Sequence, residues 1–549
     1  MFGTGLMAMS TAGGASGAGR AAAVEDALRT AGQPGRDAIA GHIADMVPVE
    51  MFIPESSRRW RPLVRDWMRF VFAHLSGPRL AAKLVEQFEM PSGAPPETRL
   101  IRLVSRMPGL QKLGQVLARN RRLPPALCAA LSQLENSMSD VTAAEVRAII
   151  VDQLGSRLET FSVELAPAIL SEASVGAVMR FTWKNPGRER ERGVFKVLKP
   201  YVPSCFGEDL ALLQQLGEYV AAPERGYEFA VRDVTEMLTE VRLLLEHELD
   251  FAREQATLAE AHRIYRASIG IRVPRVIAPL CTGAITAMSE EKGVKVTDAF
   301  RRSPARRNHI AEQLIEALIA VPLFSRERES VFHADPHAGN LFYNEPDREL
   351  IILDWALAER LGLDLRRGLV MLVLMTILRK PARVAEAVAA LSRGVRGQRR
   401  SRLHVIRRSV ERYFENLPPD HSPGTLDAMR LLDGIALEGV RFPPSLFLFR
   451  KSIFTLDGVL NDVAGAEVQI DQVIARDYLT RWISSFGLFR APLRIADLAS
   501  VEWSAVELQA RKLWGSVTGS ARASPVPKPS PKPRSARRGK SLPPALRRQ

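Results

Sequence analysis

The order of hydrophobic and polar residues divides the front of the chain into two unlike parts. Over residues 41–155, apolar residues recur at helical spacing, as in RLAAKLVEQFEM and ETRLIRLVSRM, which predicts amphipathic helices. Residues 1–40 are rich in alanine and glycine instead, and we expect them to be disordered. The pattern therefore predicts a disordered leader followed by a helical extension.

Short apolar runs replace the helical pattern after Phe161. SVGAVMRFTW and GVFKVLKP flank the polar insert KNPGRERERG, which predicts a β-hairpin. EFAVRDVTEMLTEVRLLLEHELDFAREQATLAEAHRIY returns to helical spacing and predicts one long helix or two, whereas RVPRVIAPL and GAITAMSEE are typical of strands. We predict a small lobe that contains a sheet over residues 156–292.

A mainly helical lobe is predicted over residues 293–514. It contains one hairpin, in which LFY and LIIL flank the turn residues NEPDRE. Its longest apolar run, LVMLVLMTIL from Leu369 to Leu378, is shorter than the roughly 18 to 20 residues that cross a membrane. This run predicts a buried core helix, and the whole pattern predicts an α+β fold.

Composition indicates a globular protein with a basic terminal tail. Hydrophobic residues make up 46% of the 549 residues, which is enough for a sizeable core. Of the net charge of +15, nine positive charges lie after Ala521 with no acid among them. We expect the Pro-rich tail, residues 515–549, to be disordered and available for peripheral contact with an anionic membrane, with nucleic acid a weaker alternative. A tail that only improves solubility is a further alternative.

Cysteine usage and the N-terminus indicate a reducing compartment. Cys128, Cys205 and Cys281 stand far apart in no CxxC spacing, so neither a disulfide framework nor a thiolate zinc site is predicted. The first residues lack the basic and apolar regions of a signal peptide. We expect a cytoplasmic protein without a transmembrane segment.

HADPHAGNLFYNEPDRELIILDWA, from His333 to Ala356, carries the clearest chemical pattern. Asp335 precedes Asn340 by five residues, and Asp354 follows the second strand of the predicted hairpin. In kinase-type phosphoryl transfer one Asp orients the acceptor, an Asn binds a metal ion, and a later Asp binds metal that bridges the phosphates. The spacing predicts Asp335 in the first role, and Asn340 and Asp354 as ligands of Mg²⁺.

The two histidines of this segment offer a zinc site as an alternative. His333 and His337 are four residues apart, a spacing that binds zinc on a helix. Pro336 lies between them and opposes a regular helix. We therefore expect His333 to be a structural anchor of the catalytic loop.

With this segment the chain resembles the UbiB family, also called the AarF or ADCK-type atypical kinases. GVFKVLKP is similar to the family's strand VAVKVxxP, so the resemblance makes Lys196 the residue that pairs with nucleotide phosphates. ELDFAREQA is similar to the ExD segment, with Glu248 and Asp250 as paired acids and Glu254 as the partner of Lys196. The resemblance covers about Val104 to Val463 and implies a two-lobed protein-kinase-like fold.

Two further segments match the family. KLGQ, from Lys112 to Gln115, is similar to the KxGQ signature, which the resemblance implies reaches into the nucleotide cleft, meets the ExD acids and restricts protein substrates. SEASVGAVM takes the place of the family's alanine-rich loop, whose backbone amides can cradle phosphate. The cofactor-binding residues expected in this loop and in GAITAMSEE are Ala173, Ser174, Gly176 and Met288.

The chain also departs from the family pattern. Ser171 and Glu172 replace alanines, Ala177 replaces a Gln, and Ala338 replaces a Pro. An acid in the phosphate loop would weaken nucleotide binding if it faced inward. DWA replaces DFG, and because Ala tolerates positive φ poorly, Ala356 predicts a stiffer or differently posed loop after the metal-binding Asp.

The resemblance implies a protein that binds ATP or ADP with Mg²⁺ and hydrolyses ATP or phosphorylates a small or lipid-associated substrate. It also implies a supporting role in isoprenoid quinone biosynthesis or membrane lipid homeostasis. An aminoglycoside or choline type of phosphotransferase shares the H-x-D-x-H-x-G-N pattern, but Lys112 and the pair of Glu248 and Asp250 oppose it. A non-catalytic protein switched by nucleotide is the other alternative, which Ala356 and Glu172 slightly favour and the presence of all the principal polar residues opposes.

Overall fold

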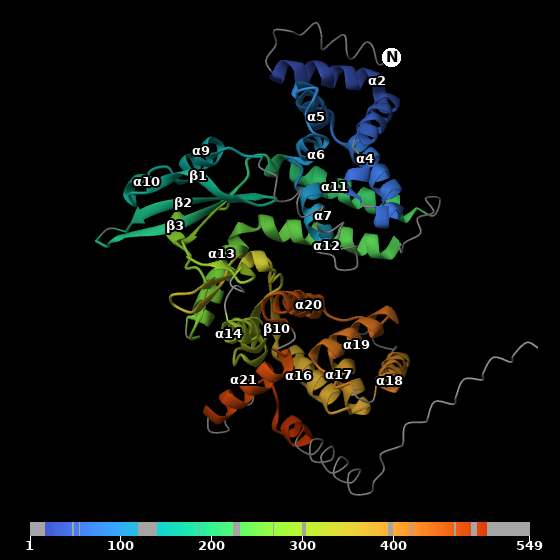
Figure 1. Cartoon of the computed structure of the whole chain (residues 1–549), viewed down its shortest axis with the longest axis vertical. Coiled ribbons are helices and arrows are strands. Elements are labelled where there is room, and N and C mark those ends of the chain that lie inside the picture. Colours follow the sequence, from blue (N-terminus) through green and yellow to red (C-terminus); the bar gives the residue numbers. More distant parts are fainter. Residues whose placement is uncertain are drawn as a thin grey trace, which may run out of the picture.

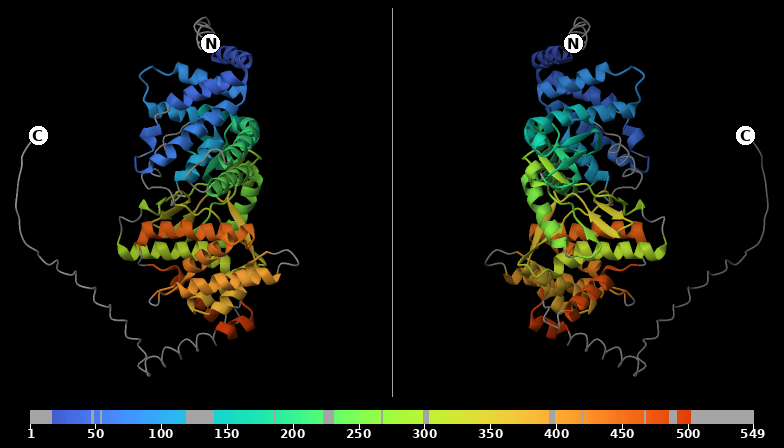
Figure 2. Two further views of the ribbon diagram at one scale, coloured as in Figure 1. Left: turned by 90° about the vertical axis from the view of Figure 1, so that its right-hand side faces the viewer. Right: turned by 90° about the vertical axis from the view of Figure 1, so that its left-hand side faces the viewer.

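A computed structural model gives the architecture of most of the chain. It describes residues 17–46, 49–53, 55–118, 140–185, 187–222, 231–266, 268–298, 303–393, 399–418, 421–465, 468–484 and 491–501. Along the long axis, a helical extension is followed by an N-lobe with a sheet and by a helical C-lobe (Figures 1 and 2). This confirms the predicted α+β, two-lobed, kinase-like fold with a helical extension. The predicted basic tail lies outside the described residues.

The extension consists of helices that pack around their own apolar core. Its elements are α2 (Gly17–Met46), α3 (Val49–Phe52), the 3-10 helix η1 (Glu55–Trp60), α4 (Arg61–His74), α5 (Gly77–Glu89), α6 (Pro96–Val104) and α7 (Pro108–Ala118). Both sequence segments with the clearest helical periodicity are helical, as predicted, since they fall in α5 and α6.

The prediction of a disordered leader over residues 1–40 is wrong for residues 17–40, which form most of α2. Alanine has the highest helix propensity, so an alanine-rich composition favours a helix once one face can be buried. Here Leu28, Ala40 and Ile43 are buried in the core that α2 shares with α4 and α5. The helix bends at Gly32, whose φ of 60° is readily adopted by glycine.

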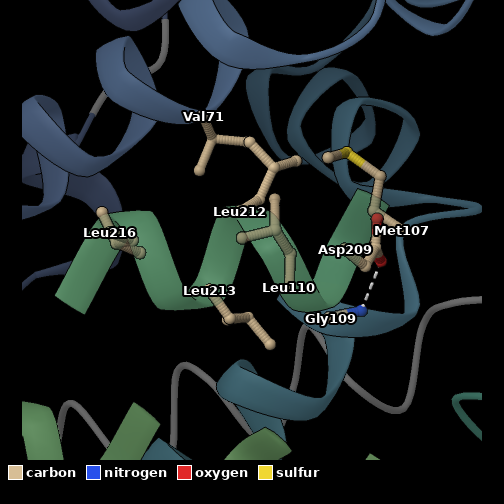
Figure 3. A pocket seen from close by; sticks show the side chains of 8 residues that line it. All are labelled: Val71, Met107, Gly109, Leu110, Asp209, Leu212, Leu213 and Leu216. Carbon is tan, nitrogen blue, oxygen red and sulfur yellow. Dashed lines mark hydrogen bonds between the residues drawn. The ribbon is translucent and has the colours of Figure 1, made fainter. Parts of the chain in front are cut away.

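Two long helices lie beneath the extension and hold α7. They are α11 (Val202–Ala221) and α12 (Val231–Leu249). The buried Asp209 of α11 accepts a 2.7 Å hydrogen bond from the backbone N–H of Gly109 at the start of α7, and it pairs with Arg79 at 2.7 Å. The surrounding apolar side chains leave a gap of only about 10 Å³ (Figure 3). The helix that carries KLGQ is therefore fixed at its first turn.

The N-lobe contains a four-stranded antiparallel sheet. In spatial order its strands are β1 (Glu164–Glu172), β2 (Gly176–Lys184), β3 (Arg190–Leu198) and β5 (Ile285–Ser289). The predicted hairpin is confirmed, because β2 and β3 pair along their whole length. On the core face, the rings of Phe181 and Phe195 stack with centroids 3.8 Å apart. A Cβ at Gly193 would lie 2.5 Å from the Phe181 ring, so this stack requires glycine there.

The predicted lobe boundary at residue 156 is wrong by one helix. α9 (Ala143–Leu154) and the short α10 (Arg157–Thr160) precede β1. Val146, Ile150 and Leu154 of α9 are buried in the same core as Phe195 of the sheet. The sequence pattern correctly predicts a helix here, but helical periodicity does not show which neighbour the helix packs against. We therefore assigned α9 to the extension, whereas it packs on the N-lobe sheet.

The long helical segment and the two predicted strands after it have different outcomes. α12 and α13 (Phe251–Tyr265) form two helices, and β5 confirms the strand in GAITAMSEE. RVPRVIAPL is not a strand: it holds one residue of β4 (Ile271–Arg272) and the 3-10 helix η3 (Ala278–Leu280). Its prolines, Pro274 and Pro279, lack the N–H groups that a strand ladder needs.

The C-lobe contains two small sheets and many helices. Its strands are β6 (Val294–Lys295), β7 (Glu329–His333), β8 (Leu341–Asn344), β9 (Glu349–Ile352) and β10 (Ala358–Gly362), and its helices are α14 (Pro304–Ile315), the π-helix η5 (Glu316–Ala320), α15 (Val321–Phe324), the 3-10 helix η6 (Ala338–Asn340), α16 (Leu363–Ile377), α17 (Pro381–Leu391), α18 (Arg399–Glu415), α19 (Thr425–Leu437), α20 (Pro444–Ala464) and α21 (Ile470–Ser484). β8 and β9 form the predicted hairpin around NEPDRE. β4 pairs in parallel with β9, so the predicted boundary at residue 292 does not separate the lobes cleanly.

The longest apolar run lies in the core of the C-lobe. Leu369, Leu372 and Met375 of α16 are buried, which confirms the prediction of a core helix. Over the described residues, none of the helices combines the length and the apolar character needed to cross a bilayer.

Candidate functional site

One cavity of about 930 Å³ lies where the two lobes and α7 meet. This volume is in the range of pockets that hold cofactors. Of the residues predicted from the sequence, all except Asp250 line it: Lys112, Gln115, Ala173, Ser174, Gly176, Lys196, Glu248, Glu254, Met288, Asp335, Asn340 and Asp354. Segments that are far apart in the sequence thus contribute to one site.

Lys196 is the centre of the charged groups in the cavity. It lies in β3 between Val178 of β2 and Thr286 of β5, which places its side chain on the cleft side of the sheet. Its Nζ lies 2.6 Å from Glu254 Oε1, the predicted ion pair, and 3.2 Å from Asp354 Oδ1. A lysine of the N-lobe is therefore joined to a helix acid and to an acid of the C-lobe.

The charges of this cluster stabilise one another against the cost of burial. Burial alone would lower the pKa of Lys196, but Asp354 and Glu254 outweigh it and raise the pKa. Desolvation alone would raise the pKa of Asp354, yet Lys196 and a hydrogen bond from the Ala356 amide lower it. Burial raises the pKa of Glu254, and Lys196 opposes that shift. An ammonium is thus held beside an ionised carboxylate at neutral pH.

His333 is a structural residue of the loop that follows β7. Its Nδ1 accepts a hydrogen bond from the Asp335 amide at 3.2 Å, and its Nε2 lies 3.1 Å from the Leu353 carbonyl oxygen. Burial lowers the pKa of His333, which favours the neutral ring. Both ring nitrogens are engaged by the backbone, so the geometry gives the zinc alternative no support and places His333 as the expected anchor.

The next turn positions Asn340 beside Asp335. Asn340 ends η6, and its Nδ2 donates to the Asp335 carbonyl oxygen at 3.2 Å. The Leu353 amide donates to the Asn340 carbonyl oxygen at 2.8 Å, which joins this turn to the segment before Asp354. The Asn340 amide oxygen and the Asp354 carboxylate are hard oxygen donors of the type that Mg²⁺ prefers.

The DWA segment differs from its expected geometry. The positive φ, 51°, belongs to Asp354, whereas Ala356 has no positive φ. Asp is one of the residues that adopt this region at modest cost, and Ala356 imposes no backbone strain. The reason for expecting a stiffer or differently posed loop, a positive φ at Ala356, therefore does not hold. Trp355 is buried, donates from Nε1 to the Ile352 carbonyl oxygen at 3.2 Å, and lies edge-on to the His333 ring.

The extension reaches the cavity through α7. Lys112 forms an ion pair with Glu248 near the end of α12, and Glu248 also accepts a 3.0 Å hydrogen bond from Ser174 Oγ in the turn between β1 and β2. Asp250 does not join them. It caps the N-terminus of α13 by accepting from the Arg253 amide at 2.9 Å, so its assignment to the site is corrected to a helix cap.

A second charged cluster beside the cavity was missed from the sequence. Lys199 Nζ lies 2.6 Å from Asp140 Oδ1 and 3.2 Å from Glu172 Oε2. Tyr201 and Gln111 also donate to Asp140, each at 2.9 Å. Lys199 directly follows β3 and lines the same cavity as Lys196, but its ammonium has different partners. These partners come from distant segments without a motif.

Comparison with known proteins gives a consistent result. Residues 133–388 match the sequence model described as the ABC1 atypical kinase-like domain. A relative in Aeromonas hydrophila, named "Probable protein kinase UbiB", is 27% identical over 68% of this chain and 67% of its own length. One of the same name in Haemophilus ducreyi is 31% identical over 42% of this chain and 43% of its own length.

A plant protein is also similar to this chain. "Protein ACTIVITY OF BC1 COMPLEX KINASE 7, chloroplastic" from Arabidopsis thaliana is 26% identical over 64% of this chain and 50% of its own length. The chain thus spans between 43% and 67% of the length of these three relatives. The matches confirm the resemblance drawn from the motifs.

Proposed function

On the premise that residues 133–388 match the ABC1 atypical kinase-like domain and that relatives named UbiB align with the chain, we propose that it binds ATP or ADP with Mg²⁺ in the cavity between its lobes. The observation that carries the proposal is the position of Lys196, which pairs with both Glu254 and Asp354 in a cavity that Asp335 and Asn340 also line. This combination is what kinase-type phosphoryl transfer requires.

Each side chain has a role in the proposed reaction. Lys196 neutralises charge on the nucleotide phosphates, and Glu254 holds its ammonium in place. Asn340 and Asp354 would hold Mg²⁺, which supplies charge neutralisation between phosphates when bound. Asp335 orients the hydroxyl of an acceptor, or a water molecule when ATP is hydrolysed. The acceptor we propose is a small or lipid-associated molecule. This rests on α7, which contributes Lys112 and Gln115 to the cavity and which we propose restricts access for a protein chain.

The pathway is a further part of the proposal. We infer a supporting role in isoprenoid quinone biosynthesis or membrane lipid homeostasis, which the names of the bacterial relatives favour. The chemistry of the site is phosphoryl transfer, so the proposal places no step on a quinone ring.

Two features had favoured a non-catalytic nucleotide switch, and neither supports it in the structure. Ala356 does not have positive φ, and the Glu172 carboxylate pairs with Lys199. An aminoglycoside or choline type of phosphotransferase is less compatible with the ion pair between Lys112 of the extension and Glu248. A catalytic atypical kinase or ATPase, with turnover that can be slow, is therefore the proposal we retain.

The test is Mg²⁺-dependent ATP turnover and nucleotide-induced thermal stabilisation of the full chain, with Asp354→Asn as the comparison. We expect ATP with Mg²⁺ to raise the melting temperature, and turnover to fall by at least about 100-fold in Asp354→Asn. The proposal would be contradicted if millimolar nucleotide produced no thermal stabilisation and no turnover. Stabilisation without turnover at any Mg²⁺ concentration would favour the nucleotide switch.

We also propose that the basic C-terminal tail and the arginine-rich helix α18 contact an anionic membrane peripherally. The charged tail lies outside the described residues, but α18 supports the proposal. Between Arg393 and Arg412 the chain has eight arginines and one acid. Arg400, Arg407 and Arg408 are exposed, and they form no ion pair within the part of the chain that the structure describes. A helix face with so much uncompensated positive charge is typical of binding to acidic lipid.

Vesicle flotation tests this partner. We expect binding to phosphatidylcholine vesicles only when they contain phosphatidylserine, with weaker binding after Arg400, Arg407 and Arg408 are all changed to Ser. Equal binding to neutral vesicles, or no binding to either, would contradict the proposal. Preferential binding to a short duplex RNA or DNA would assign the surface to nucleic acid instead.

A further inference from the structure

We propose that Glu172, through Lys199 and Asp140, positions the turn between β1 and β2 over the phosphate end of the cavity and so sets the affinity for nucleotide. This inference rests on the proposed function, since it concerns the same cavity. It assigns a role to a side chain that departs from the family's alanine-rich loop and that sequence reasoning expected to hinder binding.

The geometry joins the end of β1 to a closed cluster. Glu172 Oε2 lies 3.2 Å from Lys199 Nζ and accepts a 3.2 Å hydrogen bond from the Asp140 backbone N–H. Lys199 and Asp140 are themselves almost inaccessible, with side chains 3% and 2% exposed. Through its side chain, Asp140 also binds the amide N–H of Arg106 at 3.1 Å and Gln111 Nε2 at 2.9 Å, both at the extension. The last residue of β1 is therefore held by groups that cannot easily move.

Glu172 is not needed to neutralise Lys199. Asp140 already lies 2.6 Å from the ammonium, and a second carboxylate in a buried site adds repulsion between the two acids as well as a desolvation cost. Glu172 instead connects the end of β1 to two other segments, because its carboxylate binds both the Lys199 ammonium and the Asp140 backbone N–H. This favours a positioning role over a simple charge balance.

The residues of the turn that follow Glu172 are also held by hydrogen bonds. Ser174 Oγ binds Glu248, and the Val175 carbonyl oxygen accepts from the Lys199 backbone N–H at 2.9 Å. Within the turn, the Ala173 N–H donates to the Gly176 carbonyl oxygen at 2.8 Å. Ser171, Glu172, Ala173 and Ser174 all line the cavity. The backbone amides that would meet phosphate are thus ordered before nucleotide arrives, which reduces the entropy lost on binding.

Position and charge make opposite predictions for two conservative variants of Glu172. Glu172→Asp keeps the negative charge but shortens the reach by one methylene, so it should release the turn. Glu172→Gln keeps the reach and an acceptor oxygen for Lys199 and Asp140, but it removes the charge. If position matters, the Asp variant is impaired and the Gln variant is not. If the charge merely repels phosphate, the Gln variant binds nucleotide more tightly and the Asp variant is unchanged.

The measurement is the dissociation constant for ATP and ADP with Mg²⁺ by titration calorimetry, together with KM and kcat for ATP turnover. For Glu172→Asp we expect dissociation constants and KM to rise on the order of five- to tenfold with a much smaller change in kcat, and for Glu172→Gln values within about twofold of wild type. The matched controls are Glu191→Asp and Glu191→Gln, because Glu191 pairs with Arg275 at the far end of β3, outside the cavity.

Three outcomes would overturn the inference. They are unchanged affinity in both variants, tighter binding in Glu172→Gln, or a fall in kcat with KM unchanged in Glu172→Asp. The melting temperature without nucleotide is measured for every variant, so that a general loss of stability is recognised. Wild-type protein that binds no nucleotide would contradict the proposed function itself, whereas wild-type binding with unaffected variants would contradict only the role of Glu172.

Discussion

Lys196 and Lys199 lie three residues apart, yet they belong to clusters of opposite character. Lys196 faces the cavity, and its partner Asp354 has a side chain that is 44% exposed. Lys199 lines the same cavity, but it pairs with Asp140, and the side chains of Lys199 and Asp140 are only 3% and 2% exposed. The open cluster keeps groups accessible that a ligand can bind, whereas the closed cluster uses the same kinds of charge to fix the framework around them. An ion pair near a site is therefore informative only together with its exposure.

The largest expected effect that separates the two clusters is the loss of ATP turnover in Lys196→Met. Removing the ammonium leaves the phosphates without their charge partner, and we expect ATP turnover to fall on the order of 1,000-fold. Steady-state ATP turnover measures this, and circular dichroism checks the fold. Turnover within about tenfold of wild type would show that Lys196 does not serve the reaction.

Lys199→Met should affect stability most. It leaves the carboxylate of Asp140 buried without its cation, and breaking a buried pair in this way costs about 3–5 kcal/mol. Urea unfolding followed by tryptophan fluorescence gives the change in free energy. A loss below about 1 kcal/mol would mean that water or other donors replace the ammonium, and that the cluster is not closed in solution.

A smaller effect concerns the pH dependence of Lys196→Met. Burial raises the pKa of Glu254 and Lys196 opposes this, so the variant should have a Glu254 pKa further above its unfolded value. A carboxyl with a raised folded pKa contributes stability that is present below its unfolded pKa and is lost as pH rises through the folded pKa. We therefore expect the melting temperature of the variant to approach that of wild type at pH 5 and to fall away at pH 8. An equal difference at both values would contradict this account.

The smallest expected effect belongs to a pair outside both clusters. Glu191 and Arg275 form an ion pair at the surface, with side chains 38% and 44% exposed. Solvent screens such a pair, so Glu191→Ala should change the free energy of unfolding by less than about 0.5 kcal/mol. The same urea unfolding experiment measures it. A change as large as that of Lys199→Met would remove the distinction between closed and exposed pairs.

Elements formed by residues close in the sequence were predicted better than contacts between residues far apart in the sequence. Both hairpins and the approach of Asp335, Asn340 and Asp354 followed from turn residues and motif spacing, which act over short distances. The α2 helix was missed because its alanine-rich composition is compatible with disorder until Leu28 and Ile43 find a core.

Long-range contacts could not be predicted in the same way. The partners of Lys199 come from residue 140 and from the end of β1, and no local pattern links these segments to β3. The cap formed by Asp250 was misassigned for a similar reason. An acid at a helix end and an acid in a site look the same until the break between α12 and α13 is located.

The buried Trp355 limits how the proposed activity of this protein could be turned off. Its indole is 1% exposed, is hydrogen-bonded to the Ile352 carbonyl oxygen, and packs against His333 and Tyr265. Emptying a site of this size costs about 3–5 kcal/mol, so a form with the tryptophan swung out would be populated in roughly one molecule in a hundred or fewer. An inhibitor that needs such a form would have to supply that energy itself. Compounds directed at the turn between β1 and β2, or at the contact between Lys112 and Glu248, would not meet this barrier.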